Sequence, residues 1–199
     1  MKPKLRDQKR VVVIIHEVRG VTENLVRLAS FLTSEGFSVV LPSLYSDGYV
    51  GSDEQASYRK FYSEVGIERA SGTIGDIIEE DVGAKISLLG FSVGATVAWL
   101  LSGNGKIDSA IGFYGSRIRN HLDIEPSADV DLYFCRERGF DVEEMIGTLN
   151  AKPRVSAGLI PGEHGFYSTA PFSSPEIQRA NRLILTSLKG CFREARPCT

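Results

Sequence analysis

The strongest constraint on the fold is a series of short apolar runs that are separated by stretches with helical periodicity. Six runs rich in Val, Ile, Leu, Phe and Tyr are expected to form strands: residues 11–15, 37–41, 85–89, 110–114, 130–135 and 155–160. Because the runs are nearly continuous rather than alternating, they are typical of strands buried on both faces of a parallel sheet.

Amphipathic stretches lie between these runs. Apolar residues spaced i, i+3, i+4 and i+7 predict one helix that ends at Gly36 and another, near the C-terminus, that begins at Ser173 or Ser174 with Pro175 in its first turn. Strands alternating with helices predict an α/β fold, a doubly wound, mostly parallel sheet flanked by helices and joined by right-handed crossovers.

The length of 199 residues suits a single domain. Residues 1–10 are expected to form a basic tail and residues 190–199 a second tail. The one long connection, residues 42–72, is rich in Ser, Gly and Tyr, which favours a rim around a ligand site rather than core. Ligands of such sheets bind at the carboxyl ends of the strands, so functional residues are expected just after each apolar run.

Composition narrows the classes of function. The formal net charge of −2 offers no broad field to nucleic acid or an anionic membrane, and no apolar run is long enough to span a bilayer. Three scattered cysteines without CxxC spacing (Cys135, Cys191 and Cys198) indicate a reducing compartment rather than disulfides or a zinc site. We therefore expect a cytoplasmic protein that binds neither nucleic acid nor membrane.

A nucleophile motif follows the third apolar run. Gly90-Phe91-Ser92-Val93-Gly94 is a G-x-S-x-G sequence between an expected strand and an expected helix. Glycine is needed two positions before and after the serine, because side chains there would collide in a strained turn. Such a turn raises the Ser92 hydroxyl above the sheet and directs the Val93 amide at a developing oxyanion.

Three histidines are candidate bases for this serine. His164 follows the last apolar run and precedes the last helix, in the Ser, acid, His order of this fold. His121 lies in a polar loop seven residues after its strand, which favours a surface position. His16 ends the first run and is expected to be a structural histidine that borders the site.

Five segments resemble the dienelactone hydrolase family, in the family's order and over most of the chain. They are residues 12–20, 42–45, 90–95, 113–115 and 162–166, which look like the first strand and its turn, the segment after the second strand, the nucleophile elbow, the next strand end and the histidine loop. The resemblance implies an α/β-hydrolase fold and hydrolysis of a small-molecule ester or lactone. It implies no metal and no organic cofactor.

The resemblance also implies roles for single residues. Ser92 takes the position of the nucleophile, and Val18 is placed to give a second oxyanion amide beside Val93. Glu17 matches the family glutamate that lies beside the nucleophile in the resting site; a solvated carboxylate at the strand end is the alternative.

Arg19 and Tyr45 border the expected substrate site, and several positions there depart from the family. Arg19 stands where the family usually has an aromatic residue. Gly165 and Ser168 stand where dienelactone hydrolases carry a serine and an arginine that hold the substrate carboxylate. Dienelactone itself is therefore not the expected substrate. Arg19 or Arg59 could replace the missing charge, but an arginine that covers apolar surface is the commoner case.

The sequence leaves open which acid orients His164. In the most natural register the family aspartate falls on Arg138, which cannot accept a hydrogen bond from the imidazole. Asp141 has the family's residue type and is slightly favoured, although it could instead cap the following helix. Glu137 lies nearer the strand end, although it could instead form a surface ion pair.

Together these features predict a serine hydrolase that cleaves small carboxylic esters or lactones through an acyl-enzyme. The alternative is a non-catalytic protein with the same fold, in which Arg138 impairs the triad and the cleft serves binding. The sequence indicates neither the natural substrate nor the oligomeric state.

Overall fold

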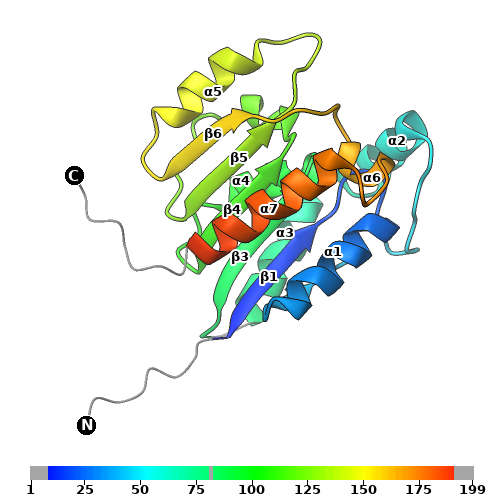
Figure 1. The fold of residues 1–199 in the computed structure, drawn as a ribbon, viewed down its shortest axis with the longest axis horizontal. Helices are drawn as coiled ribbons and strands as arrows, with labels where there is room; N and C mark the ends of the chain where they lie inside the picture. The colour runs from blue at the N-terminus through cyan, green and yellow to red at the C-terminus, as the bar shows by residue number, and fades with distance from the viewer. Residues whose placement is uncertain (1–8, 81–82, 191–199) are drawn as a thin grey trace.

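A computed structural model describes residues 9–80 and 83–190 (Figure 1). Within these residues, six strands form one sheet in the order β2-β1-β3-β4-β5-β6. The strands are β1 (Arg10–Ile15), β2 (Ser38–Val40), β3 (Lys85–Phe91), β4 (Ile107–Phe113), β5 (Asp129–Phe134) and β6 (Val155–Leu159). Neighbouring strands all pair in parallel. The six predicted strands and the predicted parallel sheet are therefore confirmed.

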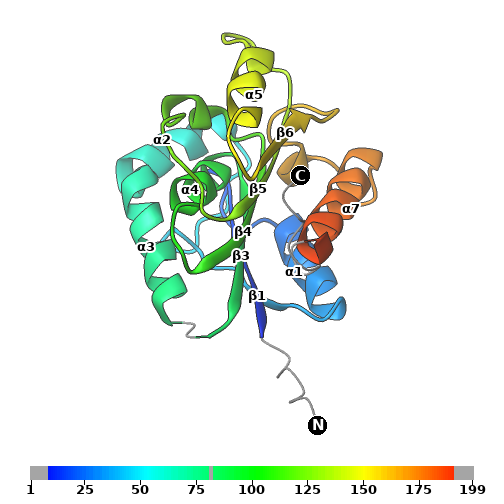
Figure 2. The ribbon, with the colours of Figure 1, turned by 90° about the vertical axis from the view of Figure 1, so that its left-hand side faces the viewer.

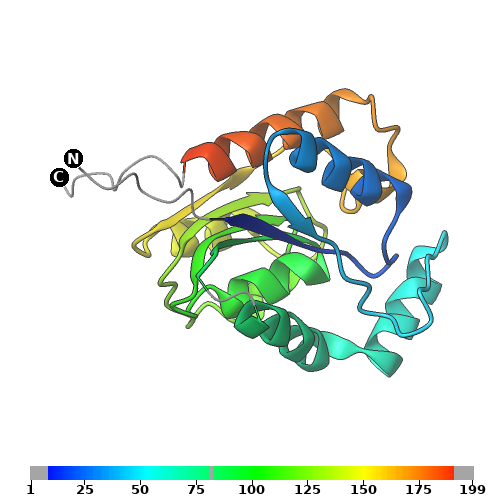
Figure 3. The same cartoon turned by 90° about the horizontal axis from the view of Figure 1, so that it is seen from below.

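Helices cover both faces of the sheet, as the end-on views show (Figures 2 and 3). One face carries α1 (Glu23–Ser34) and α7 (Pro175–Gly190), and the other carries α3 (Gly66–Glu80), α4 (Val93–Leu101) and α5 (Val142–Asn150). Three further elements are α2 (Glu54–Glu64), α6 (Phe166–Thr169) and the 3-10 helix η1 (Ser116–Asn120). This arrangement is the predicted doubly wound architecture.

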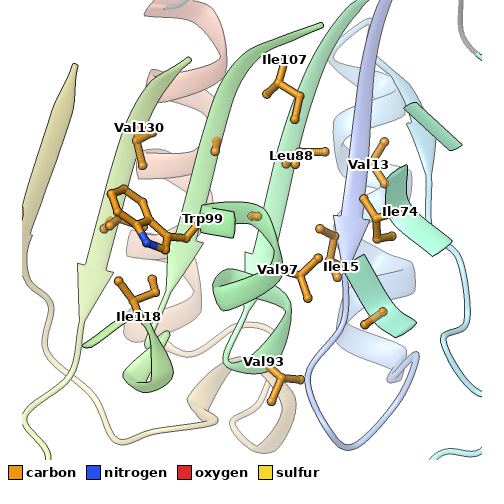
Figure 4. Packing of buried hydrophobic residues seen from close by; sticks show 14 of the residues in the cluster. Val13, Ile15, Ile74, Leu88, Val93, Val97, Trp99, Ile107, Ile118 and Val130 are labelled. Atoms are coloured by element: carbon orange, nitrogen blue, oxygen red, sulfur yellow. The ribbon is translucent and has the colours of Figure 1, made fainter. Parts of the chain in front are cut away.

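The core beneath α4 fixes the helix that follows Ser92. Ile15 and Leu88 of the strands pack with Val97 of α4 and Ile74 of α3 in one buried cluster (Figure 4). Trp99 of α4 is fully buried, and its indole N–H donates to the His121 carbonyl at 2.8 Å. α4 is therefore held against the sheet along its length.

The ends of two helices follow the predicted signals. Gly36 lies two residues beyond α1 with a φ of +90°, which glycine adopts without strain. The Ser174 hydroxyl accepts a hydrogen bond from the Ile177 N–H at the start of α7.

Residues 42–72 differ from the expectation. They contain α2 and the first half of α3, and Phe61 and Ala70 are fully buried in the core. The Asp53 side chain caps α2 by accepting from the Ala56 N–H at 2.6 Å. This part of the segment therefore contributes to the core, and its role as a rim of the active site stays a prediction.

The expected tails lie mostly outside the described residues. Arg10 already belongs to β1 and Gly190 to α7, so neither tail includes these two residues. Cys191 and Cys198 also lie outside the described residues, whereas Cys135 is buried with a free thiol. In the part of the chain that the structure describes, no helix is both long and apolar enough to cross a membrane.

A side chain covers part of the exposed edge of β6. Asn150, the last residue of α5, donates from its amide nitrogen to the Ala157 carbonyl at 3.0 Å. Its amide oxygen accepts from the Ala157 N–H at 2.8 Å. β6 is the last strand of the sheet, so the Asn150 amide occupies the place that a further strand would take.

Candidate active site

Ser92 occupies a strained turn between β3 and α4. Its φ of 51° and ψ of −113° lie outside the regions that a serine normally adopts. A Cβ on Gly90 would lie 2.2 Å from the Gly94 carbonyl oxygen, and a Cβ on Gly94 would lie 2.1 Å from the Ile15 carbonyl oxygen. A side chain at either glycine position would therefore collide with the backbone, as the motif predicts. The turn leaves the serine partly exposed above the carboxyl end of the sheet.

Ser92, His164 and Glu137 form a hydrogen-bonded row. The Ser92 hydroxyl oxygen lies 2.8 Å from His164 Nε2, and His164 Nδ1 lies 2.6 Å from Glu137 Oε1. The side chains of His164 and Glu137 are 26% and 22% exposed, so both are partly open to solvent. The loops after β5 and β6 bring the acid and the histidine to the serine that follows β3.

Asp141 has a different place. Its carboxylate accepts from the Glu144 N–H at 3.0 Å and caps the N-terminus of α5. The slight preference for Asp141 as the partner of His164 does not agree with this geometry, in which Glu137 is the partner. Glu137 starts nearer the strand end, and its additional methylene group lets the carboxylate reach the imidazole. Arg138, in the register of the family aspartate, is exposed.

The environment of His164 favours its protonated form. Burial opposes the charge of the imidazolium, but the hydrogen bond and the negative charge of Glu137 outweigh burial and raise the pKa of His164 above its usual value. Glu17 adds to the same effect. A carboxylate on Nδ1 also fixes the tautomer in which Nε2 is free to accept the serine proton.

Glu17 is a buried carboxyl group behind this row. It is 1% exposed, and among the described residues neither carboxylate oxygen has a hydrogen-bond partner. Burial raises its pKa, against the opposing effects of Ser168, His164 and Arg19. The Glu17 side chain is therefore not the solvated strand-end carboxylate that the sequence left open.

The turn after β1 lies against the serine turn. Val93 is the first residue of α4, and the next residue, Gly94, packs closely on the carbonyls of Ile15 and His16. Val18 follows two residues later. Tyr45, expected to border the substrate, is only 3% exposed, and its hydroxyl donates to the Val18 carbonyl at 2.6 Å. Tyr45 therefore holds the turn after β1 from its buried side.

Arg19 is engaged by neighbouring acids. Its guanidinium lies 3.7 Å from Glu17 Oε1 and 3.5 Å from Glu54 Oε2, and it also donates to the Ser52 carbonyl. The Arg19 side chain is 12% exposed, whereas Arg59 is exposed on α2. Arg19 thus ties the turn after β1 to the start of α2.

One further residue of the site, Tyr114, was not assigned a role there from the sequence. Tyr114, at the end of β4, has a φ of 42° and is 1% exposed, and its ring centroid lies 5.0 Å from that of His164. His16 is fully buried and makes two hydrogen bonds, as expected for a structural histidine. The position of Tyr114 at the end of the apolar run 110–114 was the available signal. His121 contacts α4 through its backbone and takes no part in the row.

The described residues contain no group of three or more His, Cys, Asp or Glu side chains placed to hold a metal ion. The chemistry available at the site is that of a serine hydroxyl, an imidazole and a carboxylate.

Solved structures define the class of the fold. A protein from Klebsiella pneumoniae assigned to the dienelactone hydrolases superposes with a TM-score of 0.73, at 18% identity, over 94% of this chain and 90% of its own. A dienelactone hydrolase-like promiscuous phosphotriesterase from metagenomic libraries gives a TM-score of 0.65, at 14% identity, over 94% and 88% of the two chains. The fold is that of an α/β hydrolase.

Sequence comparison identifies the family. Residues 1–136 match the model of the dienelactone hydrolase family, and the chain belongs to that family. Over 179 residues it is 28% identical to the uncharacterized protein YczH of Bacillus subtilis, covering 88% of this chain and 87% of that protein. Over 128 residues it is 27% identical to a carboxymethylenebutenolidase of Pseudomonas putida, but this match covers 58% of the chain and only 54% of the enzyme.

Proposed function

We propose that the protein hydrolyses small carboxylic esters or lactones through an acyl-enzyme on Ser92. The hydrogen-bonded row of Ser92, His164 and Glu137 carries the proposal, because it supplies a nucleophile, a base and an orienting acid in contact distance. Relatives that are hydrolases support it.

The proposed reaction has two halves. Ser92 Oγ attacks the carbonyl carbon while His164 Nε2 takes the hydroxyl proton, and the carbonyl electron pair moves onto oxygen. The N–H groups of Val18 and Val93 donate to this oxyanion, and the imidazolium then protonates the departing alkoxide as the acyl-enzyme forms. In the second half, His164 removes a proton from water, the resulting hydroxide attacks the acyl carbon, and Ser92 leaves with the proton.

A neutral substrate fits the charges at the site better than an anionic one. Arg19 lies in the turn after β1 and is already paired with the carboxyl groups of Glu17 and Glu54. Ser168 cannot supply the cation of the dienelactone hydrolases. We therefore expect kcat/KM for a short neutral ester to equal or exceed that for an anionic lactone. A strong preference for dienelactone would contradict this expectation.

Covalent labelling tests the proposal directly. A fluorophosphonate probe should add one phosphonyl group to the wild-type protein, and peptide mass spectrometry should locate it on Ser92. Ser92→Ala should remove the label and lower kcat by about 10⁴-fold or more, with an unchanged circular dichroism spectrum. His164→Ala should be comparably inactive, whereas His121→Ala should retain activity. Labelling at another serine, or no labelling of a folded protein, would reject the mechanism and favour a binding function.

A further inference from the structure

A buried hydrogen-bond chain runs through His16 to the turn after β1. The Leu44 N–H, in the segment after β2, donates to His16 Nε2 at 2.9 Å. His16 Nδ1 lies 2.6 Å from the Glu17 carbonyl oxygen. A backbone N–H can only donate and a carbonyl can only accept, so His16 must carry its proton on Nδ1.

The hydrogen bonds through His16 end at the peptide group that joins Glu17 to Val18. The Glu17 carbonyl and the Val18 N–H belong to the same planar peptide unit and point in opposite directions. A donor that fixes the carbonyl oxygen therefore fixes the direction of the N–H. The Gly20 N–H also donates to this carbonyl at 3.0 Å, so two donors hold the plane. Donation to a carbonyl also polarises its peptide group and strengthens the N–H as a donor.

The next peptide group is held as well. The Tyr45 hydroxyl donates to the Val18 carbonyl, and the Tyr45 ring stacks on the His16 ring with centroids 5.6 Å apart and planes at 14°. The peptides before and after Val18 are thus clamped by two side chains that pack on each other. His16 is fully buried, and burial lowers its pKa to about 4, so it stays neutral at ordinary pH.

We propose that His16 is a positioning residue for the oxyanion hole, which orients the Val18 N–H through the Glu17 carbonyl without touching substrate. The inference rests on the proposed function, since it assumes that the Val18 N–H stabilises an oxyanion. It assigns to the first strand end a role in transition-state stabilisation that is separate from the Ser92 and His164 chemistry.

Two substitutions separate the two hydrogen bonds of His16. His16→Asn places an amide N–H near the position of Nδ1, so it keeps the donor to Glu17 and loses the acceptor for Leu44. His16→Gln places an amide oxygen near the position of Nε2, so it keeps the acceptor and loses the donor. The two variants are matched in polarity and burial, and both lack a titrating ring.

Activity should depend on the hydrogen bond that His16 donates to the Glu17 carbonyl and not on the one that it accepts from the Leu44 N–H. We expect His16→Gln to lower kcat by about 10- to 100-fold, with KM within about twofold, because loss of a complete oxyanion donor costs about 10²- to 10³-fold. A boronic acid that mimics the tetrahedral intermediate should bind more weakly by a similar factor. His16→Asn should stay within about threefold of wild type in both measurements. The pH at which activity is half-maximal should not move, since His164 and Glu137 are unchanged.

Several results would overturn the inference. Full kcat in folded His16→Gln would do so, as would equal losses in both variants. If a variant does not fold, nitrogen NMR of the wild-type imidazole decides instead, and a proton on Nε2 rather than Nδ1 would reject the hydrogen-bond chain. Fluorophosphonate labelling of Ser92 in wild type and both variants keeps this test distinct, because absence of labelling in the wild type would reject the proposed function itself.

Discussion

Two acids in the connection between β5 and α5 show how position divides roles between similar side chains. Glu137 accepts from His164, and Asp141 caps α5. Glu137→Gln should lower kcat by about 10⁴-fold, because an amide leaves the imidazole without the carboxylate that fixes its tautomer and stabilises its charge. Steady-state kinetics on a p-nitrophenyl ester measure this effect.

Asp141→Asn is the matched control for that substitution. It removes a carboxylate four residues away and should keep nearly full kcat, because asparagine also caps helices well. The residual activity of Glu137→Gln should also persist to lower pH than that of wild type, since Glu137 raises the pKa of His164 and the base must be neutral. Loss of activity in Asp141→Asn with retention in Glu137→Gln would reverse the assignment.

The pKa of His16 makes a testable contribution to stability. Its folded pKa, about 4, lies below the unfolded value of about 6.5, so the unfolded chain binds the proton more readily. The free energy of unfolding should therefore fall by up to about 3 kcal/mol on account of His16 as pH drops from 6.5 to 4. The contribution is complete above pH 6.5. Urea unfolding of wild type at about pH 7, 5.5 and 4.5 measures it.

His16→Asn is the reference for that measurement. The raised pKa of Glu17 acts in the opposite direction, because its contribution is lost as pH rises, but Glu17 is present in both proteins. The other titratable ring on His16 is Tyr45, whose pKa is raised by burial and which stays neutral throughout. A constant difference in stability between wild type and variant from pH 7 to 4.5 would contradict the prediction.

Among the residues of the candidate site, the sequence indicated Ser92 and His164 more clearly than the acid that contacts His164. Ser92 stands in a motif whose two glycines are required by backbone contacts, and His164 follows a strand directly. The acid depends on the path of an irregular loop and on the length of a side chain. Asp141 and Glu137 are both plausible by spacing, and only the three-dimensional path separates them. The burial of Tyr45 could not be predicted for a related reason, since its contacts come from residues far apart in sequence.

At the level of the elements, the serine turn requires close contact between α4 and β1. Gly94→Ala should destabilise the protein by about 3 kcal/mol or more and should reduce activity, because the new Cβ would meet the Ile15 backbone oxygen, which no rotamer change can move. Thermal unfolding and ester hydrolysis measure the two effects together.

Gly75→Ala in α3 is the opposite case and the control. A Cβ on Gly75 would meet no atom within 4 Å, so alanine should stabilise the helix by about 0.5–1 kcal/mol through its higher propensity and leave activity unchanged. Equal effects of the two substitutions would show that close packing at Gly94 is not what requires glycine there.

Strands were easier to predict than the helices between β2 and β3. β1, β3 and β4 are apolar runs that are buried almost throughout, which makes them easy to recognise, whereas the edge strands β2 and β6 are only partly buried. α2 has few apolar residues and a single fully buried large one, Phe61, so its periodicity is weak. α3 carried a clearer signal, with buried Ala70, Ile74 and Ile78 at helical spacing, but Gly and Ser residues around them obscured it.

At the scale of the whole molecule, an uncovered sheet edge at β6 would promote self-association. Asn150→Ala would free the Ala157 N–H and carbonyl that its amide now pairs. The variant should lose about 1–2 kcal/mol of stability and should show more concentration-dependent association than wild type, because an open edge accepts another strand. Sedimentation velocity over a range of concentrations measures the association.

Thr148→Ala is the control for the edge. Thr148 is exposed on the same helix, two residues before Asn150, and its hydroxyl bonds only within α5 among the described residues. It should sediment like wild type. If Asn150→Ala also sediments like wild type and is equally stable, then the side-chain amide does not protect the edge.

The backbone at Ser92 has a consequence for how such a protein can be improved. Ser92 and Tyr114 both have positive φ, at the ends of neighbouring strands, and such conformations cost about 1–3 kcal/mol each for residues other than glycine. Laboratory evolution that rewards heat resistance alone would gain by replacing Ser92 with glycine, and would discard the proposed nucleophile in doing so. Selection for thermostable variants of this chain therefore has to score turnover and survival in the same round, or it will enrich inert proteins.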